Sequence, residues 1–321
     1  MKRRSFLRLS GASLIGLQDA QYSLALGLEP TDGARKLKLD HPLADPFCLK
    51  WGGSYYLMGT YSTGRPGQTG RAFDLLRSPD LDKWESLGPV LEIPEYEVSR
   101  KANYWAPEIL PFGNKYFLYY TSDAFGDPYR RFVRVAVAKN IEGPYQSEGH
   151  PLTAAPSIDG HPVYPDGKEG YLFYTGNEGN PHMGQLLVDR LISPTQLQGR
   201  PKKVFPNETV EWEEGSFILN RNRAFYLFTS QGNWRNNTYH VLVAKSKAIL
   251  GPYSRISDQT SRPVLSSNAE QFGPGHNSIF DGPGERKYIC YHAWDKARTG
   301  RYAWVAPLQW DGDFPSVVEE G

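Results

Sequence analysis

"HPLADPFCLKWGGSYYLMGT", residues 41–60, is the stretch that decides the fold of this chain. An apolar run follows a single carboxylate, Asp45, turns at Gly52-Gly53 and returns as a strand rich in aromatic residues. Two such runs joined by a short glycine turn are typical of a β-hairpin. A carboxylate at the head of a buried strand is costly unless it is paired or functional. We therefore asked whether Asp45 belongs to a repeated pattern.

The same plan recurs four more times along the chain. Each copy has a short apolar strand, a turn built from Gly, Asn, Asp or Pro, and a return strand rich in Tyr and Phe. The copies begin at Ala44, Trp105, Ile158, Glu214 and Gly275. The residues taken as markers at their heads are Asp45, Ala106, Asp159, Glu214 and His276. These markers lie 61, 53, 55 and 62 residues apart, and each precedes an aliphatic residue of the return strand by 12 or 13 residues.

Each copy is long enough for four strands, because a further strand pair follows the hairpin. Examples are VAVAKNIEGPYQ at residues 135–146 and VLVAKSKAILGPYS at residues 241–254. A strand repeat of this length is typical of a propeller, and no helix-length amphipathic stretch competes with it. The sequence therefore predicts an all-β fold, a five-bladed β-propeller around a central channel, as a single domain over residues 38–316.

The composition narrows the classes of partner. The 321 residues carry a net charge of +1, so nothing indicates nucleic acid as a partner. No segment has the length of a membrane span. Aromatic residues make up 13% of the chain, which suits a protein with aromatic binding surfaces. Cys48 and Cys290 both lie in apolar runs and are interpreted as buried free thiols. The sequence does not indicate the oligomeric state.

The N-terminal residues MKRRSFLRLSGASLIGL, 1–17, resemble a twin-arginine export signal. Arg3-Arg4 precedes Ser5, Phe6 and Leu7, an apolar stretch follows, and Ala25 closes a cleavage region. We expect a leader over residues 1–30 and a periplasmic or extracellular location, with a basic N-terminal tail as the alternative.

The markers indicate chemistry as well as fold. In a propeller the innermost strands begin at the same end of the channel, so Asp45, Asp159 and Glu214 should converge there. Two carboxylates across a cleft can hydrolyse a glycosidic bond, one as a proton donor and the other as a base or nucleophile. A third carboxylate can raise the pKa of its neighbour. Trp105 and Trp234, near the heads of two copies, could supply apolar faces for sugar rings.

At this point the chain resembles glycoside hydrolase family 43, whose members are five-bladed propellers that include arabinanases, arabinofuranosidases and β-xylosidases. The motifs that carry the resemblance are ADPF at Ala44, YWAPEI at Tyr104, SID at Ser157, EEGSFIL at Glu213, GPGHNSI at Gly273 and PLQWDGDFP at Pro307. Their order and spacing cover residues 38–316. The chain departs from the family where GSF follows Glu214, a place where relatives usually show Gly-Pro.

The resemblance implies an inverting mechanism and a role for each marker. Asp45 is expected to be the general base, Glu214 the general acid, and Asp159 the carboxylate that orients the acid and raises its pKa. Among neighbouring carboxylates, Glu211 and Glu213 are rivals of Glu214, which was preferred because it starts the repeat in register. Glu108 is interpreted as structural.

The resemblance also implies substrate contacts and bears on cofactors. His276 at the channel axis and Arg301 in the last blade are expected to bind substrate, together with Trp105 and Trp234. No cofactor is required. His276 is the one candidate metal ligand, for a structural calcium ion at the channel axis, although the chain has no acidic calcium loop.

Function is predicted as hydrolysis of plant-type polysaccharide or its oligosaccharides, with α-L-arabinosyl linkages first and xylosyl linkages second. One alternative is a sugar-binding propeller without catalysis. Another is a retaining enzyme on the same fold, which would need its carboxylates about 5 to 5.5 Å apart, against about 6.5 to 9.5 Å for inversion. Endo or exo action is not decided by the sequence.

Overall fold

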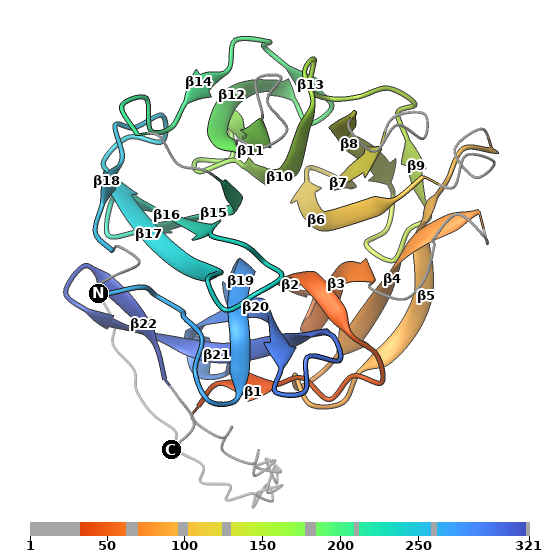
Figure 1. Cartoon of the computed structure of the whole chain (residues 1–321). Helices are drawn as coiled ribbons and strands as arrows, with labels where there is room; N and C mark the ends of the chain where they lie inside the picture. Colours follow the sequence, from red (N-terminus) through yellow and green to blue (C-terminus); the bar gives the residue numbers. More distant parts are fainter. Residues whose placement is uncertain are drawn as a thin grey trace, which may run out of the picture. The chain divides into compact units, whose positions relative to one another are not determined.

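The computed structural model describes residues 33–61, 70–95, 102–123, 130–176, 184–208, 212–257 and 262–318. Within these residues nearly all regular structure is β-strand, and the one helical element described over its full length is a 3₁₀ turn at Pro283–Glu285. The strands form five blades around a common axis, with antiparallel pairing inside each blade and one parallel pairing between the outer strands of the first and second blades (Figure 1). The predicted all-β, five-bladed propeller is confirmed.

The blades follow one another in sequence. The first is β2 (Leu43–Trp51), β3 (Ser54–Tyr61), β4 (Arg71–Ser78) and β5 (Glu85–Glu92). The second is β6 (Tyr104–Phe112), β7 (Lys115–Asp123), β8 (Arg131–Ala138) and β9 (Tyr145–Ser147). The third is β10 (Ser157–Val163), β11 (Gly170–Gly176) and β12 (Gln185–Ser193), edged by β13 (Gln196–Leu197) and β14 (Lys202–Lys203). The fourth is β15 (Glu213–Arg221), β16 (Ala224–Gln231), β17 (His240–Ser246) and β18 (Ser254–Arg255).

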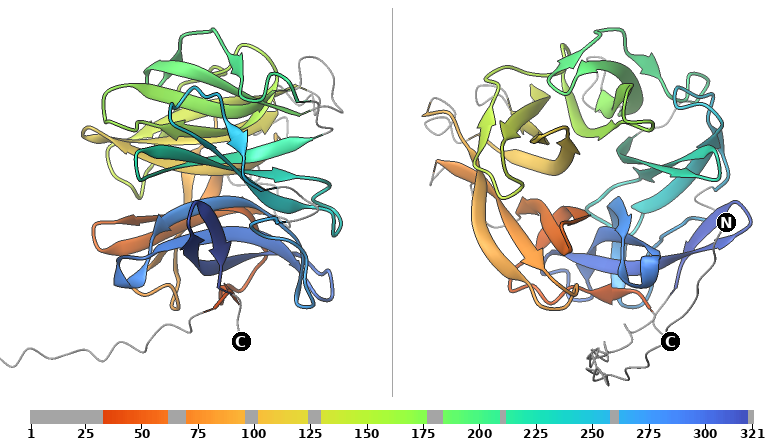
Figure 2. Two further views of the ribbon diagram at one scale, coloured as in Figure 1. Left: turned by 90° about the vertical axis from the view of Figure 1, so that its left-hand side faces the viewer. Right: turned by 180° about the vertical axis from the view of Figure 1, so that it is seen from behind.

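The last blade is completed by the start of the domain. It contains β19 (Gln271–Asp281), β20 (Lys287–Asp295) and β21 (Arg301–Asp311), and the outer edge of β21 pairs with both β1 (Arg35–Lys36) and β22 (Phe314–Val317). Strand β1 lies beside the last blade in Figure 2. It begins at Arg35, three residues before the domain start at residue 38 that the sequence predicts. A two-residue strand has no readable periodicity, so the sequence could not indicate this closure of the ring.

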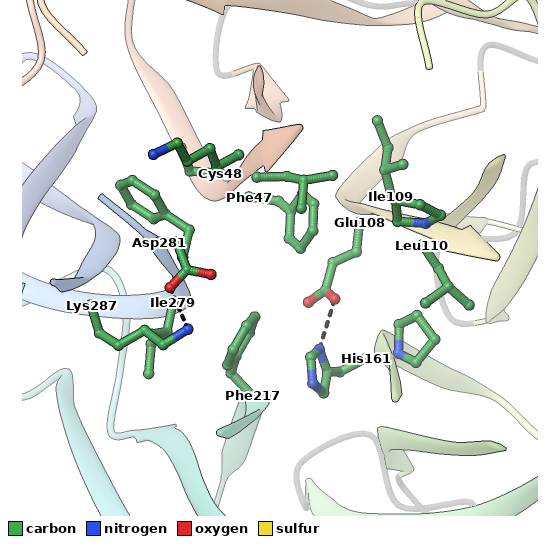
Figure 3. Close-up of a pocket in the computed structure, with 15 residues that line it drawn as sticks. Phe47, Cys48, Glu108, Ile109, Leu110, His161, Phe217, Ile279, Asp281 and Lys287 are labelled. Atoms are coloured by element: carbon green, nitrogen blue, oxygen red, sulfur yellow. Dashed lines mark hydrogen bonds and ion pairs between the residues drawn. The ribbon is translucent and has the colours of Figure 1, made fainter. Parts of the chain in front are cut away.

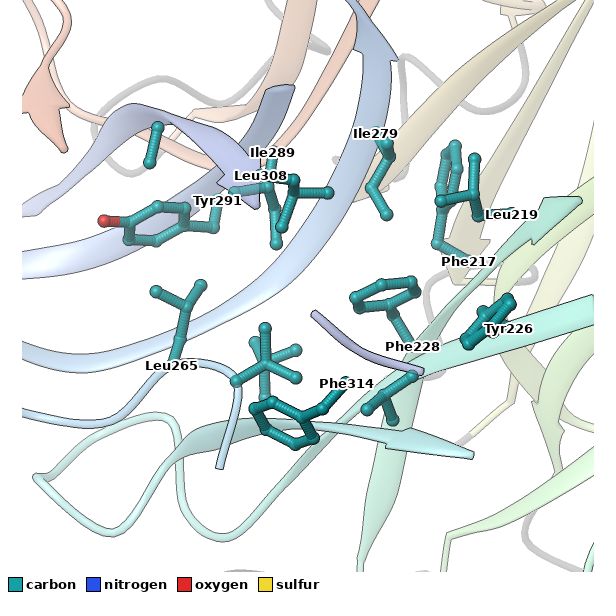
Figure 4. Packing of buried hydrophobic residues seen from close by; sticks show 14 of the residues in the cluster. Phe217, Leu219, Tyr226, Phe228, Leu265, Ile279, Ile289, Tyr291, Leu308 and Phe314 are labelled. Atoms are coloured by element: carbon teal, nitrogen blue, oxygen red, sulfur yellow. The ribbon is translucent and has the colours of Figure 1, made fainter. Parts of the chain in front are cut away.

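The blades pack face to face through apolar side chains. Between the fourth and fifth blades, Phe217 and Phe228 from one side meet Ile279, Ile289 and others from the other side (Figure 4). Similar clusters of buried residues lie between the other blades. The aromatic return strands noted in the sequence therefore supply the core between the blades.

A β-bulge at the head of each innermost strand sets the register of the site. The bulge residues have positive φ angles of 48°, 45°, 60°, 59° and 49° at Asp45, Ala106, Asp159, Gly215 and His276. The equivalent residue of the fourth blade is thus Gly215, and the expectation that Glu214 starts that repeat in register is wrong by one residue. A bulge leaves a residue unpaired, so spacings of 12 and 13 could not be distinguished from sequence.

A ring of hydrogen bonds joins each blade to the next at these bulges. One position of each second strand provides the partner; these residues are Thr60, Thr121, Thr175, Ser230 and His292. The Thr60 hydroxyl accepts the Ala106 N–H at 2.8 Å, and the Thr121 hydroxyl accepts the Asp159 N–H at 2.9 Å.

The last two blades and the closing seam continue this ring. The Ser230 hydroxyl accepts the His276 N–H at 2.8 Å, and His292 Nδ1 lies 3.0 Å from the Asp45 N. The fourth blade differs, because the Gly215 N–H is hydrogen-bonded to Asp159 and the Thr175 hydroxyl instead donates to the Glu213 carbonyl at 3.0 Å. The ring holds the head of every inner strand at one level of the channel.

The assignment of Gly215 to the bulge position can be tested with two alanine variants. A Cβ on Gly215 would lie 3.2 Å from both Cα and Cγ of His276, whereas a Cβ on Gly113, also at positive φ, would meet nothing within 4 Å. Gly113→Ala should therefore lower the free energy of unfolding by about 1 to 2 kcal/mol through its backbone alone. Gly215→Ala should cost clearly more. Urea unfolding of both variants makes the comparison, and equal losses would contradict the crowding at His276.

Candidate active site

Three carboxylates and a histidine from four blades meet at one end of the channel. His276 Nδ1 lies 3.5 Å from Asp45 Oδ1 and 3.8 Å from Asp159 Oδ2. Asp45, Asp159, Glu214 and His276 are only 8–9% exposed. The structure thus brings these four residues together in a space largely closed to solvent.

Glu214 is held by two side-chain donors. The Tyr239 hydroxyl donates to its Oε1 at 2.7 Å, and Trp212 Nε1 donates to its Oε2 at 2.5 Å. The neighbouring Glu213 instead forms two hydrogen bonds with the Arg255 guanidinium, at 2.9 and 2.8 Å. Successive residues of a strand point to opposite faces, so Glu213 binds Arg255 of its own blade while Glu214 faces the cluster. The other rival, Glu211, lies outside the described residues.

The surroundings of Asp45 favour its ionised form. Burial has the largest effect and raises its pKa, but the charges of Arg301 and His276 outweigh burial. The pKa of Asp45 therefore lies well below its usual range. Arg301 Nη1 donates to Asp45 Oδ1 at 3.3 Å, and His292 Nδ1 lies 3.1 Å from the same oxygen.

Asp159 differs from Asp45 in its electrostatics. Burial raises the pKa of Asp159 to about 8; the charge of His276 opposes this, and the charges of Glu214 and Asp45 add to it. The raised pKa is that of Asp159 itself, and the expected action of Asp159 on the pKa of the acid stays a prediction. Two carboxyl groups in one cluster thus have pKa values moved in opposite directions, which is typical of acid and base sites.

His276 lies between carboxylates whose charges favour its protonated form. Burial lowers the pKa of its imidazole, but the charges of Asp159, Asp45 and Glu214 outweigh burial and raise that pKa. Among the described residues no group of three or more His, Cys, Asp or Glu side chains is arranged to hold a metal ion. The axial calcium ion stays a prediction, and no step below depends on it.

Trp234 supports Arg301. The Arg301 guanidinium lies 4.2 Å from the centroid of the Trp234 ring, and the Arg235 guanidinium lies at the same distance. Trp294 is stacked nearly parallel to Trp234, and its Nε1 donates to the Trp234 carbonyl at 2.7 Å. Trp234 therefore acts on the site through the arginine that binds Asp45, a contact that the sequence did not indicate.

Trp105 lies at the channel end that holds the carboxylates. It pairs with Thr121 immediately before the bulge of the second blade, which is the position of Glu214 in the fourth blade. Its side chain is half-buried, and the Arg131 guanidinium lies 4.8 Å from its ring centroid. The position suits the expected contact with substrate.

Sequence reasoning missed three residues that touch the carboxylates: Trp212, Tyr239 and His292. A signal existed for His292, because it lies three residues after the aliphatic Ile289, as Thr60 lies three after Leu57. No signal marked Trp212 or Tyr239, since their contacts depend on how loops between strands return to the channel.

Behind the carboxylates the channel holds a cavity of about 240 Å³ (Figure 3). Glu108 and His161 line it and bind each other, with Glu108 Oε2 2.8 Å from His161 Nδ1. His161 Nε2 also accepts the Ile218 N–H at 3.0 Å. Glu108 and His161 therefore join three blades, which agrees with the structural role expected for Glu108.

The chain is similar to known proteins over nearly the whole propeller. Residues 39–315 match the family described as Glycosyl hydrolases family 43. A β-D-galactofuranosidase of Aspergillus niger is 29% identical, over 78% of this chain and 73% of that protein. An extracellular endo-α-(1→5)-L-arabinanase of Bacillus subtilis is 24% identical over 98% of both chains. An extracellular exo-α-(1→5)-L-arabinofuranosidase of Cellvibrio japonicus is 26% identical over 86% of both.

Solved structures share the fold. A thermostable family-43 glycoside hydrolase superposes with a TM-score of 0.75 at 23% identity, over 89% of this chain and 95% of that chain. A xylan β-1,4-xylosidase of Bacillus halodurans superposes with a TM-score of 0.73 at 18% identity, over 89% of this chain and 57% of that chain. No helix among the described residues is long and apolar enough to cross a membrane. The expected leader, residues 1–30, lies outside the described residues.

The raised pKa of Asp159 predicts a pH-dependent gain in stability for Asp159→Asn. Between the ordinary pKa near 4 and the folded value of about 8, the folded state holds a proton that the unfolded state releases. Raising the pH through this range therefore destabilises the wild type but not the variant. The difference in free energy of unfolding should increase by more than about 1 kcal/mol from pH 5 to pH 8.

Thermal unfolding of both proteins across this pH range measures the effect. Asp166→Asn is the matched control, because Asp166 caps an exposed turn and its pKa is lowered by backbone N–H groups of that turn. It should show no such gain. A pH-independent difference for Asp159→Asn would contradict the assigned electrostatics.

Proposed function

Because this chain belongs to glycosyl hydrolases family 43, and is thus a glycoside hydrolase, we propose that it cleaves α-L-arabinosyl linkages with inversion of configuration. The observation that carries the proposal is the convergence of Asp45, Asp159 and Glu214 around His276, with opposite pKa shifts at Asp45 and Asp159. The substrate is a plant-type polysaccharide or its oligosaccharides.

Asp45 is proposed as the general base. Its low pKa keeps it ionised, so it can take a proton from a water molecule that attacks the anomeric carbon opposite the leaving group. Arg301, His276 and His292 all contact its Oδ1, which fixes the carboxylate in one orientation. The resulting bond joins water oxygen to the anomeric carbon while the bond to the leaving oxygen breaks.

Glu214 is proposed as the general acid that protonates the leaving oxygen. The hydrogen bonds from Tyr239 and Trp212 stabilise the carboxylate that remains after the proton has left. Asp159 is proposed to orient this end of the site and to keep a proton there, since the charge of Glu214 helps to raise its pKa.

The choice of sugar rests on the relatives. Those named above include an arabinanase, an arabinofuranosidase and a galactofuranosidase, and two of these names specify a furanose, a five-membered sugar ring. We therefore place arabinosyl substrates first. Xylosyl substrates are the second candidate, because a solved structure with this fold is a xylosidase. Trp105, His276 and Arg301 are proposed to contact the sugar, with Trp234 acting behind Arg301.

Proton NMR of the anomeric signals during digestion tests the reaction. Linear arabino-oligosaccharides should yield products of inverted configuration first, and xylo-oligosaccharides should react more slowly. Glu214→Gln and Asp45→Asn should each lose about 10²-fold or more of kcat, since each removes a proton-transfer group. Glu142→Gln, a change at a half-exposed pair with Arg77, is the control and should keep full activity.

Early products of retained configuration would replace inversion by a double-displacement mechanism. Hydrolysis that survives both active-site substitutions would overturn the residue roles. A faster reaction with xylo-oligosaccharides would make xylosyl linkages the first candidate substrate and arabinosyl linkages the second.

We also propose that the chain is exported. Two of the relatives named above are described as extracellular, and Arg3-Arg4 precedes an apolar stretch as in a twin-arginine signal. Replacement of both arginines by lysine should retain the protein in the cytoplasm, as judged by cell fractionation. Unchanged export would exclude the twin-arginine route.

A further inference from the structure

The ring of hydrogen bonds between blades contains one histidine among hydroxyl residues. At the partner position the first four blades have Thr60, Thr121, Thr175 and Ser230, and the fifth blade has His292. A hydroxyl is enough to pair a bulge N–H, as Thr60, Thr121 and Ser230 show. The larger imidazole at the fifth position therefore calls for another explanation.

His292 contacts more than the backbone of Asp45. Its Nδ1 lies 3.0 Å from the Asp45 N and 3.1 Å from the Asp45 Oδ1. Its ring also stacks on the ring of Tyr239, with centroids 5.7 Å apart and planes 7° from parallel. The Tyr239 hydroxyl donates to Glu214 Oε1 at 2.7 Å. A continuous series of contacts thus runs from Asp45 through His292 and Tyr239 to Glu214.

The surrounding residues leave room for this arrangement and hold it in place. Gly275 lies directly opposite His292 in the sheet, and a Cβ there would lie 2.0 Å from Cε1 of Tyr239. The glycine therefore makes the space that the Tyr239 ring occupies. His292 and Tyr239 are both 0% exposed, so close packing restricts them to one conformation.

We propose that His292 and Tyr239 are positioning residues that together set the separation and relative orientation of Asp45 and Glu214. The inference rests on the proposed function, in which these carboxylates are base and acid. An inverting glycosidase depends on that separation, because water must fit between the base and the sugar. A hydroxyl at position 292 would serve the Asp45 N–H but would reach neither the Asp45 carboxylate nor Tyr239.

The charge on Asp45 does not depend on His292 alone. Arg301 from β21 and His276 from β19 also face the Asp45 carboxylate, with Asp159 and Glu214 as its acidic neighbours. Burial and the charge of Arg301 lower the pKa of His292 to about 4, so His292 is neutral near pH 7. Loss of its imidazole should therefore disturb mainly the placement of Asp45.

Two substitutions separate the contacts. His292→Thr gives the fifth blade the residue type found in the first three, which should retain the interblade hydrogen bond and the fold. Tyr239→Phe keeps the stacking and removes only the hydrogen bond to Glu214. Tyr226→Phe is the matched control, because the Tyr226 hydroxyl also donates to a carboxylate, Asp313 at 2.7 Å, outside the site.

We expect kcat to fall by about 10- to 100-fold in both site variants, with KM changed less than about threefold, because misplaced groups slow the chemical step. Tyr239→Phe should affect substrates with poor leaving groups much more than aryl glycosides with good ones, since only the former need a well-placed acid. Tyr226→Phe should match the wild type.

Crystal structures of the wild type and both variants give a readout that does not depend on turnover. The distance between the Asp45 and Glu214 carboxylates should change in His292→Thr. An unchanged distance together with unchanged kinetics would overturn the proposal, as would equal losses on good and poor leaving groups in Tyr239→Phe. A wild type that hydrolyses no glycoside would refute the proposed function, while the distance would still test the positioning role.

Discussion

The backbone N–H at the head of each innermost strand is the constraint on which this structure depends. The bulge turns this buried group away from its own sheet, and a buried donor without a partner is costly. In four of the five blades the previous blade supplies the partner through a residue of its second strand, and the last of these contacts joins His292 to Asp45 across the closing seam. The same contacts that close the propeller therefore bring the carboxylates of the cluster to one end of the channel.

Each departure from five-fold regularity involves a carboxylate of the site. In the fourth blade the Gly215 N–H is hydrogen-bonded to Asp159. Asp159 is thus linked to the residue that directly follows Glu214. In the fifth blade a histidine replaces a hydroxyl residue and contacts Asp45. Asp45, Asp159 and His276 also have positive φ angles, a strained backbone conformation that the contacts of the surrounding ring maintain. The strand heads are regular where their contacts only join one blade to the next. They are irregular where their residues belong to the carboxylate cluster.

Asp45, Asp159 and Glu214 could be selected from the sequence because strand repeats have a countable period and because inner strands share one starting level. The count was one residue out in the fourth blade, since a bulge adds an unpaired residue that leaves no mark in the pattern of apolar side chains. Glu214 was nevertheless the right carboxylate to select for the cluster, because the alternation of a strand turns Glu213 towards Arg255.

By itself, the sequence determined the all-β propeller, its five repeats and the set of acidic residues at their heads, because each is a matter of local periodicity. Only the tertiary structure decided which side chains surround those acids. Tyr239 reaches Glu214 across the space left by Gly275, and Trp234 reaches Asp45 only through Arg301. Such contacts join residues far apart in the chain through the packing of separate blades. That packing depends on loop paths and side-chain volumes. Neither produces a periodic pattern in the sequence, so neither could be predicted from it.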